Sequence, residues 1–418
     1  MFRKKTLNNG LTVLTDEMAH VRSVAIGVWL KRGSRHETPE ESGLAHFIEH
    51  MVFKGTEKRS QARIAQEMDE IGGQTDAFTS QEYAGFHAKV LDEQLSRAVD
   101  LLSDIVVAPR FDAEELERER MVILEEMKSV EDAPEELVHE IFAERFWPNH
   151  PMGRPILGTE ATVAGFSRDD LVAFFRKTYA PSNIVVAAAG AFEHAKLLEL
   201  VESQFEGLDA PPDGVVETAP DVAPNILFQH KDLEQAHLVL GSVAPHASSS
   251  DRFVAYVLSA VVGGNMSSRL FQVIREERGL AYSVYSGVTS FNDCGQFSVY
   301  AGTDPKNVPE VLDLTMKELG RIKTEPMPEE ELQRAKDHLR GSMLMGLEST
   351  GSRMSRLARQ EMVFGRHVSV DEALKGLEAV RPEDVQRLAV EIFGERELAM
   401  TLLGRDEFVD PRPESLVA

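Results

Sequence analysis

The order of apolar segments along the first half of the chain recurs along the second half. Each half shows an apolar strand, a buried helix, an amphipathic helix and then two strands. In the first half these segments are residues 24–30, 43–53, 64–71, 74–80 and 83–91. In the second half they are residues 237–243, 253–262, 267–277, 281–290 and 296–303. Strands separated by helices, with antiparallel-looking strand pairs, predict an α+β domain that occurs twice.

The boundary between the two copies is predicted at Ala210–Asn225, where Pro and acidic residues are frequent and no hydrophobic period is visible. A chain of 418 residues is long enough for two domains of about 200 residues each. We therefore expect an N-terminal domain over residues 1–212 and a C-terminal duplicate over residues 222–418. Each should resemble an α/β sandwich, in which a mostly antiparallel sheet packs against helices.

Composition and charge limit the classes of protein to consider. Hydrophobic residues make up 42% of the chain and charged residues 27%, as in an ordinary soluble globular protein. The formal net charge of −24 argues against nucleic-acid binding, which needs a basic surface. It would favour a basic peptide as partner if the acidic residues line an interior surface.

The sequence also bears on location. We expect no membrane partner, because neither a signal peptide nor a spanning segment is visible. The single cysteine, Cys294, excludes an intramolecular disulfide and suits a reducing compartment. Since an Arg-rich transit peptide is also missing from the sequence, a bacterial cytoplasm is the simplest location.

The segment HFIEH at residues 46–50 carries the most specific chemistry. On a helix with His46 at zero, Glu49 lies near 300° and His50 near 40°, at about 100° per residue. Both imidazoles therefore share one face and can hold a single zinc ion, with a carboxylate beside them to transfer a proton. Apolar residues surround the motif, and ionisable groups on a buried helix are costly unless they are paired or bound to metal. The arrangement resembles the HxxEH signature of the inverzincin metallopeptidases.

A third protein ligand is expected on the helix predicted at residues 112–131, with Asp112 as its N-cap. With Leu116 at zero, Glu119 lies near 300° and Glu126 near 280°, at about 100° per residue. Both acids fall inside an arc of apolar residues, which comprises Val122, Ile123, Leu124, Met127 and Val130. Acids in a core-facing stripe break the binary pattern, as functional residues often do. Glu126 is the better candidate for a ligand and Glu119 for an acid beside it; a charged helix with an irregular stripe is the alternative.

Beyond these motifs, the chain resembles the pitrilysin family over nearly its whole length. The closest resemblance is to the short-chain branch, which includes the mitochondrial processing peptidase. Three blocks match this family in order, SGLAHFIEHMVFKGT, IGGQTDAFTS and GGNMSSRLFQVIREERGLAYSVYS. The family's glutamate ligand corresponds to Glu126, and its second catalytic acid to Glu119. Asp76 departs from the pattern, because many members carry Asn there; the carboxylate keeps an acceptor but lacks the amide donor.

The resemblance implies one zinc ion per chain, held by His46, His50 and Glu126. It also implies that Glu49 acts as general base for the water that attacks the peptide bond. The second copy has no such site, because residues 253–262 contain neither His nor Glu. We therefore expect a single metal site, in the first half of the chain.

Two further groups of residues are assigned by the resemblance. Arg275 and Tyr282 match a pair that contacts substrate and stabilises the reaction intermediate. The family's edge strand, along which an extended peptide pairs through its backbone, corresponds to Asp76, Ala77, Phe78 and Thr79. In short-chain members the Arg–Tyr pair faces the zinc across a closed chamber and comes from the partner subunit. Because this chain carries both sets of residues, a homodimer with two composite sites is expected.

The function that these observations favour is a zinc-dependent endopeptidase for short or unfolded peptides, including basic ones similar to presequences. Two alternatives stay open. The chain could be a non-catalytic structural subunit, like the core proteins of the respiratory bc1 complex, although such proteins typically lose motif residues that are retained here. It could also be the active half of a heterodimer, although the presence of both Arg275 and Tyr282 counts against that.

Overall fold

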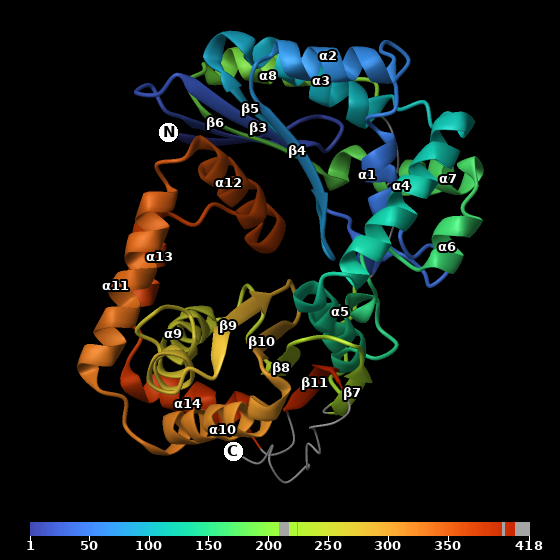
Figure 1. Ribbon diagram of the computed structural model, residues 1–418. Coiled ribbons are helices and arrows are strands. Elements are labelled where there is room, and N and C mark those ends of the chain that lie inside the picture. The colour runs from blue at the N-terminus through green and yellow to red at the C-terminus, as the bar shows by residue number, and fades with distance from the viewer. Residues whose placement is uncertain (209–216, 224, 395–397, 406–418) are drawn as a thin grey trace. The chain divides into compact units, whose positions relative to one another are not determined.

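The computed structural model in Figure 1 describes residues 1–208, 217–223, 225–394 and 398–405. Half of the linker predicted at Ala210–Asn225 lies outside these described residues. The chain divides into two units. The first consists of Met1–Lys128, Arg154–Glu217 and Met345–His367, and the second of Ser129–Gly153, Thr218–Leu344 and Val368–Ala418. Each unit thus combines segments from both of the ranges predicted as domains, 1–212 and 222–418.

Six strands form the sheet of the first unit, in the order β1-β2-β6-β3-β5-β4. Neighbouring strands are antiparallel except for β2 and β6, which are parallel. The strand β4 is therefore one edge of this sheet. The strands are β1 (Phe2–Thr6), β2 (Thr12–Glu17), β3 (Ser23–Leu30), β4 (Gln74–Thr79), β5 (Ala84–Leu91) and β6 (Ile184–Gly190).

Five strands form the sheet of the second unit, in the order β7-β11-β8-β10-β9. Their directions repeat those of β2-β6-β3-β5-β4, including one parallel pair, β7 and β11. The predicted fold class, a duplicated α+β arrangement with mostly antiparallel sheets, is confirmed. The strands are β7 (Ile226–His230), β8 (Ala236–Val243), β9 (Ala281–Ser290), β10 (Gly295–Thr303) and β11 (Ala399–Gly404).

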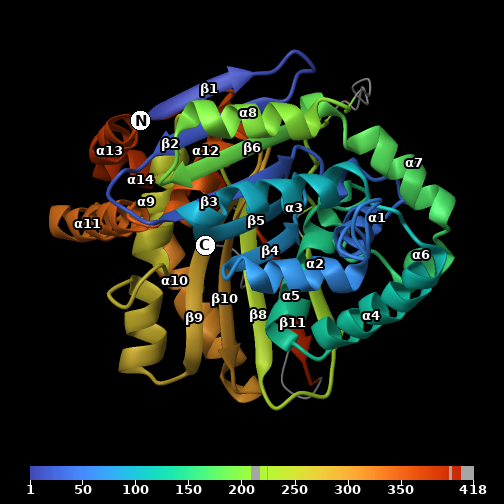
Figure 2. The ribbon, with the colours of Figure 1, turned by 90° about the horizontal axis from the view of Figure 1, so that it is seen from above.

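Helices cover both faces of the first sheet. Because side chains alternate along a strand, Val24 and Ile26 of β3 face the main core, whereas Ala25 and Trp29 face the opposite side. Figures 1 and 2 show α3 and α8 along the first of these faces. The helices that lie entirely or mostly in this unit are α1 (Leu44–Met51), α2 (Gln61–Glu70), α3 (Leu95–Val107), α4 (Ala113–Glu131), α6 (Glu160–Gly165), α7 (Arg168–Thr178), α8 (His194–Phe205) and α12 (Thr350–Phe364).

The opposite face of the first sheet is covered by α12, a helix from the C-terminal half of the sequence. Met354 and Leu357 of this helix belong to the same buried cluster as Trp29. The indole Nε1 of Trp29 donates to the Met354 sulfur at 3.3 Å, and Lys4 of β1 forms an ion pair with Glu361 at 2.6 Å. Apolar contact and ion pairing therefore attach α12 to the first unit.

The second sheet shows the reciprocal exchange, because α5 precedes the linker in sequence yet packs on this sheet. Phe142 of α5 lies against Gly241 of β8, where a side-chain Cβ would come within 2.4 Å of the ring. Val138 and Phe146 share the same cluster. The segment 267–277, predicted as an ordinary amphipathic helix, contains a π-helix at Phe271–Glu277. The remaining helices are α5 (Pro134–Phe146), α9 (Arg252–Val262), α10 (Val308–Thr324), α11 (Glu329–Gly346), α13 (Val370–Glu378) and α14 (Pro382–Ile392).

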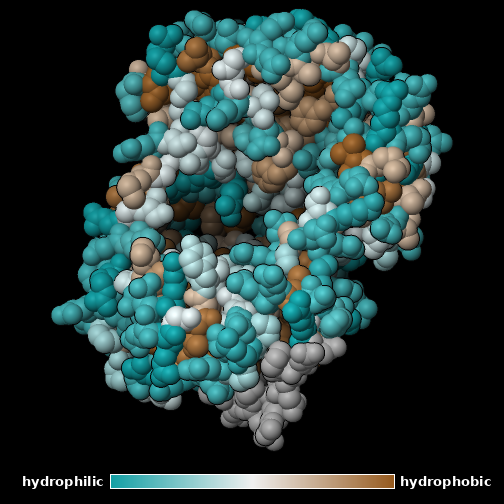
Figure 3. Space-filling view, in the orientation of Figure 1, coloured by the Kyte–Doolittle hydropathy of each residue, from teal (hydrophilic) through white to brown (hydrophobic). Residues whose placement is uncertain are grey.

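The surface and the interior separate by polarity. Hydrophilic residues cover most of the face drawn in Figure 3. Apolar side chains of the described residues gather in buried clusters between each sheet and its helices. Within the described ranges, none of the helices combines the length and the apolar composition needed to cross a bilayer.

Candidate metal centre

The short helix α1 carries three of the predicted site residues, His46, Glu49 and His50. It begins after Gly43, whose φ of 101° is a conformation that side chains rarely adopt. A Cβ at this position would also meet the carbonyl oxygen of Leu157 at 2.6 Å. Glycine at this position therefore lets the chain enter the helix beside another backbone segment.

The N-terminus of α1 is held by the side chain of Glu37, a buried residue. Its two carboxyl oxygens accept the N–H groups of Gly43 at 2.9 Å and of Ala45 at 2.7 Å. Burial raises the pKa of Glu37 to about 8, although these two hydrogen bonds oppose the rise. The first turn of the helix, whose N–H groups lack partners within the helix, is thus satisfied by a residue outside it.

The helix α4 supplies the predicted carboxylates. Asp112 accepts the N–H of Glu114 at 2.9 Å, in keeping with its predicted role as a cap. The expectation for Val122 is wrong, because this residue is 49% exposed. The buried stripe of the helix is narrower than the predicted apolar arc, and it includes Arg120. The guanidinium of Arg120 donates to the carbonyl oxygen of Phe166 at 2.7 Å.

The structure brings His46, His50 and Glu126 together. One ligand atom from each residue can be chosen so that all three lie within 4.8 Å of one another. The Nε2 atom of His46 is 3.7 Å from Glu126 Oε1, and that of His50 is 3.4 Å from Glu126 Oε2. Helical spacing places the two imidazoles side by side on α1, and α4 adds the carboxylate from a distant part of the sequence.

This set of residues fits a zinc ion. Two imidazole nitrogens and one carboxylate oxygen are a donor set found in catalytic zinc sites, where a fourth position stays open. The Nδ1 atom of His46 is buried and has no hydrogen-bond partner among the described residues. The Nε2 atom of this ring, on the side of Glu126, is the nitrogen that is available to a metal ion.

Glu119 orients His50 from the other side of the ring. It is only 5% exposed, and its Oε2 lies 3.1 Å from His50 Nδ1. Its second oxygen forms an ion pair with Lys54 at 2.6 Å. Burial alone would raise the pKa of Glu119, but the hydrogen bonds from His50 and Lys54 lower it, so the carboxylate stays charged. An Nδ1–H bound to Glu119 leaves Nε2 of His50 available as a ligand.

The two histidines differ in their affinity for protons. Burial lowers the pKa of His46 to about 4, and the neighbouring His50 adds to this effect. Burial would lower the pKa of His50 as well, but its hydrogen bonds with Glu119 and Glu126 raise it to about 9. In the metal-free protein at neutral pH, the imidazole of His46 is therefore neutral, whereas that of His50 is positively charged.

Glu49 lies on α1 beside the histidines and contacts the edge strand. Its Oε2 accepts a hydrogen bond of 2.5 Å from the hydroxyl of Thr79, the last residue of β4. Burial raises the pKa of Glu49, although the hydrogen bond from Thr79 lowers it. A partly buried carboxylate with a raised pKa is well suited to accept a proton near neutral pH.

The predicted peptide-binding strand is β4, the edge of the first sheet. Its side chains alternate between the two faces. Ala77 packs against the main core and Thr79 reaches Glu49, whereas Phe78 contacts Trp29 on the opposite face with ring centroids 5.4 Å apart. Asp76 is exposed on the face of Phe78, and one of its oxygens accepts the N–H of Ala77 at 2.9 Å.

A groove of about 440 Å³ lies between α2 and β4, beside His50 and Glu119. Its lining combines apolar side chains with the polar groups already described. The residues that line it are Glu49, His50, Phe53, Lys54, Gln61, Ile64, Ala65, Met68, Thr75, Asp76, Ala77 and Glu119. The groove thus places apolar surface next to the cluster of candidate ligands.

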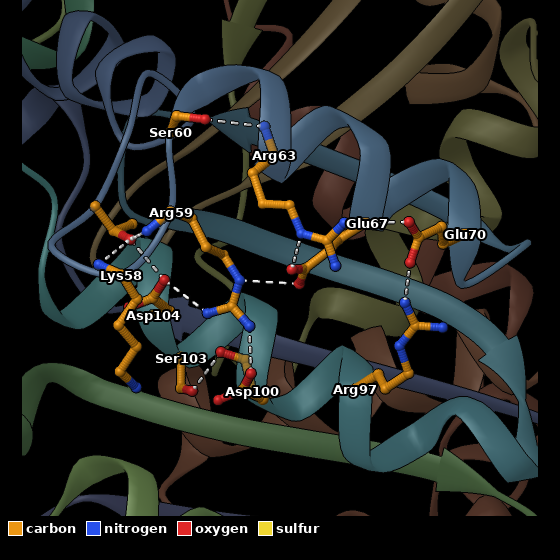
Figure 4. A network of polar contacts seen from close by, with 11 residues as sticks. Lys58, Arg59, Ser60, Arg63, Glu67, Glu70, Arg97, Asp100, Ser103 and Asp104 are labelled. Carbon is orange, nitrogen blue, oxygen red and sulfur yellow. Dashed lines mark hydrogen bonds and ion pairs between the residues drawn. The ribbon is translucent and has the colours of Figure 1, made fainter.

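The wall of this groove formed by α2 is fixed by a network of charged side chains, shown in Figure 4. Arg59, in the loop before α2, donates to Glu67 at 2.9 Å, to Asp104 at 2.8 Å and to Asp100. Asp104 is buried in α3 and also accepts the hydroxyl of Thr56 at 2.6 Å. The network ties the loop, α2 and α3 together.

Arg275 and Tyr282 belong to the second unit, where they contact each other. The guanidinium carbon of Arg275 lies 4.6 Å from the ring centroid of Tyr282 and 4.7 Å from that of Phe271. Tyr282 is 79% exposed, so its stacking on Arg275 leaves both groups accessible. A cation over an aromatic face is an attractive arrangement.

Reasoning from the sequence missed three contacts of the site. These are the ion pair between Lys54 and Glu119, the hydrogen bond from Thr79 to Glu49, and the cap that Glu37 forms on α1. The first two join residues that are far apart in sequence. For Glu37, an acid placed shortly before a buried helix was an available signal, because acids are favoured at helix N-termini.

Comparisons with known proteins place this geometry in context. Residues 12–160 match a family model described as "Insulinase (Peptidase family M16)", and residues 165–339 match one described as "Peptidase M16 inactive domain". An uncharacterized zinc protease of Bacillus subtilis is 40% identical over 395 residues, which cover 94% of this chain and 96% of that protein. One of Streptomyces coelicolor is 40% identical over 402 residues, with 94% and 88% covered.

Solved structures share the fold. A protease from Helicobacter pylori superposes with a TM-score of 0.90 at 22% identity, covering 97% of this chain and 99% of that one. A chain of Complex III2 from Candida albicans superposes with a TM-score of 0.86 at 20% identity, covering both chains completely. At these identities the likeness extends to the fold alone.

Proposed function

We propose that this chain, which belongs to the M16 (insulinase) family of peptidases, is a zinc-dependent endopeptidase that hydrolyses short or unfolded peptides. Relatives named zinc proteases support a zinc peptidase in general. The observation that carries the specific proposal lies within the first unit. The ligand atoms of His46, His50 and Glu126 lie within 4.8 Å of one another, next to Glu49, which is hydrogen-bonded to an edge strand.

His46, His50 and Glu126 would hold one zinc ion per chain. When bound, zinc polarises a carbonyl group as a Lewis acid and lowers the pKa of water to about 7. Glu119 keeps His50 in the tautomer that presents Nε2, and Lys54 keeps Glu119 charged. These two residues therefore act through His50 and set the position of its ring.

Glu49 is the group that moves the proton. It takes a proton from the attacking water and then returns it to the leaving amine. The hydroxyl of Thr79 holds Oε2 of Glu49 and so fixes the direction of the other oxygen. Because burial raises the pKa of Glu49, this carboxylate is a stronger base than an exposed one.

An extended peptide suits the surface beside these residues. Asp76, Ala77, Phe78 and Thr79 lie on an edge strand, where a peptide can pair through its backbone. The groove beside it offers apolar contacts from Phe53 and Met68 among others, so we propose that it receives an apolar side chain of the substrate. Backbone pairing explains affinity for unfolded segments with a modest sequence preference.

Arg275 and Tyr282 complete the proposal as residues that contact the substrate and stabilise the negative charge of the intermediate. Their mutual stacking keeps the guanidinium pre-oriented. We propose a homodimer with two composite sites, because the chain carries both the candidate ligands and this pair. A monomer that is fully active at micromolar concentration would contradict the dimer. For location we propose a bacterial cytoplasm.

The experiment compares the zinc-loaded wild type with Glu49→Gln on an unstructured basic peptide of about twenty residues, long enough to pair along a strand of ordinary length. The proposal predicts cleavage by the wild type, and loss of cleavage in the variant with zinc content unchanged. Cleavage that survives in Glu49→Gln would contradict the assigned base. A wild type that binds zinc and cleaves none of a panel of peptides would contradict the peptidase function.

A further inference from the structure

The face of the first sheet that carries Phe78 also carries, at its edge, a row of opposed residues with a single charged member, Asp76. In the register of the sheet, Asp76 of β4 lies directly opposite His87 of β5, and His87 lies opposite Gly27 of β3. Directly opposed residues of antiparallel strands present their side chains on the same face. A peptide that paired with β4 would extend this row by one residue, whose side chain would lie beside Asp76.

The carboxylate of Asp76 is available to such a side chain. Asp76 is exposed, and among the described residues its carboxylate forms no ion pair with a lysine or arginine. Its Oδ1 accepts the N–H of Ala77, which holds the group along its own strand. An unpaired charge on an edge strand commonly discourages pairing with the wrong chain, and it can equally select the right one.

His87 gives the row a polar but uncharged second member. Burial lowers the pKa of His87, although the charge of Asp76 opposes this, so the imidazole is neutral at physiological pH. Its Nδ1 atom is buried without a hydrogen-bond partner in the part of the chain that the structure describes. A neutral imidazole beside Asp76 leaves the negative charge of the row uncompensated.

The neighbouring positions on this face differ in charge. Phe78, two residues along β4, is fixed by Trp29 and Tyr83, with ring centroids 5.4 and 5.9 Å away. In the other direction, Gln74 lies opposite Lys89, which is exposed. A cation beside Asp76 would therefore meet a carboxylate, whereas a cation two residues further along would approach the ammonium group of Lys89.

We propose that Asp76 determines specificity by binding a lysine or arginine side chain of the substrate, at the single peptide position that pairs opposite it. The inference rests on the proposed peptidase function and deepens it, because it names a cationic residue at one place in the peptide. Residues on either side of that position point to the opposite face and make no contact with Asp76. An opposite-charge pair across strands strengthens binding by about two- to fivefold, and salt weakens the effect.

The test measures peptide binding without requiring cleavage. A single lysine is moved through each position of a fluorescent, unstructured glutamine-rich peptide, and affinity for zinc-loaded Glu49→Gln protein is measured by anisotropy. The inference predicts one position at which lysine binds about two- to fivefold more tightly than glutamine. Adding Asp76→Asn to the protein should bring this lysine-to-glutamine ratio close to one.

Charge reversal and a matched control sharpen the test. With Asp76→Lys added instead, glutamate should become the preferred residue at the same position. Asp69→Asn, which removes an exposed carboxylate of α2 away from the row, should leave the ratio unchanged. Because the ratio compares two peptides on the same protein variant, a general loss of affinity in that variant does not change it. If Asp76→Lys does not fold, the isosteric variant Asp76→Asn still tests the inference.

The outcomes separate this inference from the function on which it rests. If the wild type cleaves the peptides but lysine is favoured at no position, or favoured equally in Asp76→Asn, the inference is overturned and the peptidase function stands. If lysine is selected at one position and the wild type cleaves none of the peptides, the function is overturned instead. A preference for lysine at one position that is lost in Asp76→Asn, together with cleavage by the wild type, supports both the inference and the peptidase function.

Discussion

Zinc binding should depend steeply on pH, because His50 is a positively charged imidazolium in the metal-free protein. Burial alone would lower the pKa of His50, but hydrogen bonds with Glu119 and Glu126 raise it to about 9. Burial lowers the pKa of His46 to about 4. Only a neutral imidazole can ligate zinc. His50, which carries protons on both ring nitrogens, must therefore lose one of them on binding, whereas His46 is already neutral at neutral pH.

The magnitude follows from the pKa of His50. At pH 7, about two units below a pKa of about 9, the proton lowers the apparent zinc affinity about 100-fold, or about 2.7 kcal/mol. Between pH 5 and pH 8 the affinity should rise about tenfold per pH unit, and above pH 9 it should level off. Replacing Glu119 with Gln removes one of the two acids that retain the proton. The pKa of His50 should then fall, and the rise in affinity should level off at a lower pH.

Competition with a chelator of known, pH-corrected affinity measures this dependence directly. Calorimetry at pH 7.5 in buffers of different ionisation enthalpy should report close to one proton released per zinc ion for the wild type and fewer for Glu119→Gln. An affinity that is constant between pH 6 and pH 8 would refute the reasoning. So would equal proton release by the two proteins.

Three further predictions concern the supports of the site. Arg59→Met should lower the Tm of the first unit by about 6 to 12 °C in calorimetry, because it leaves the buried Asp104 carboxylate without its positively charged partner; a change below about 2 °C would contradict this. Thr79→Val should move the acidic limb of the kcat/KM profile to higher pH, because the hydrogen bond from Thr79 lowers the pKa of Glu49 and the variant lacks it; an unmoved limb would exclude this role. The pKa of Glu37 is about 8 in the folded protein and 4.5 in an exposed glutamate, so the stability that this group contributes is present in full below pH 4.5 and is lost as pH rises towards 8. The Tm of the wild type relative to Glu37→Gln should therefore fall between pH 5 and pH 8, and parallel curves would contradict this.

Local patterns in the sequence predicted much of the site. The spacing of His46 and His50 is a property of any α-helix, so their proximity follows as soon as the helix is predicted. Glu126 was found because an acid in an apolar stripe conflicts with the binary pattern, and the structure places it beside both histidines. The duplication was visible because strand and helix periodicities recur in the same order, and the two sheets repeat their strand order.

Contacts made by tertiary packing escaped prediction. The hydrogen bond between Thr79 and Glu49 joins residues 30 positions apart, and it depends on how closely β4 approaches α1. The reciprocal placement of α5 and α12 depends on which sheet their apolar faces fit, and the periodicity of an amphipathic helix does not specify its partner. Val122 shows the same limit, because the width of a buried stripe is set by the neighbours of the helix.

The measurement that tests the central claim most directly is anomalous diffraction at the zinc absorption edge from crystals of the zinc-loaded protein. We predict one strong anomalous peak per chain, bonded to His46, His50 and Glu126. The three bonds should have lengths of about 2.0 to 2.2 Å, as zinc forms with nitrogen and oxygen. A map without a peak at these residues, or with its only peak elsewhere in the chain, would contradict the account.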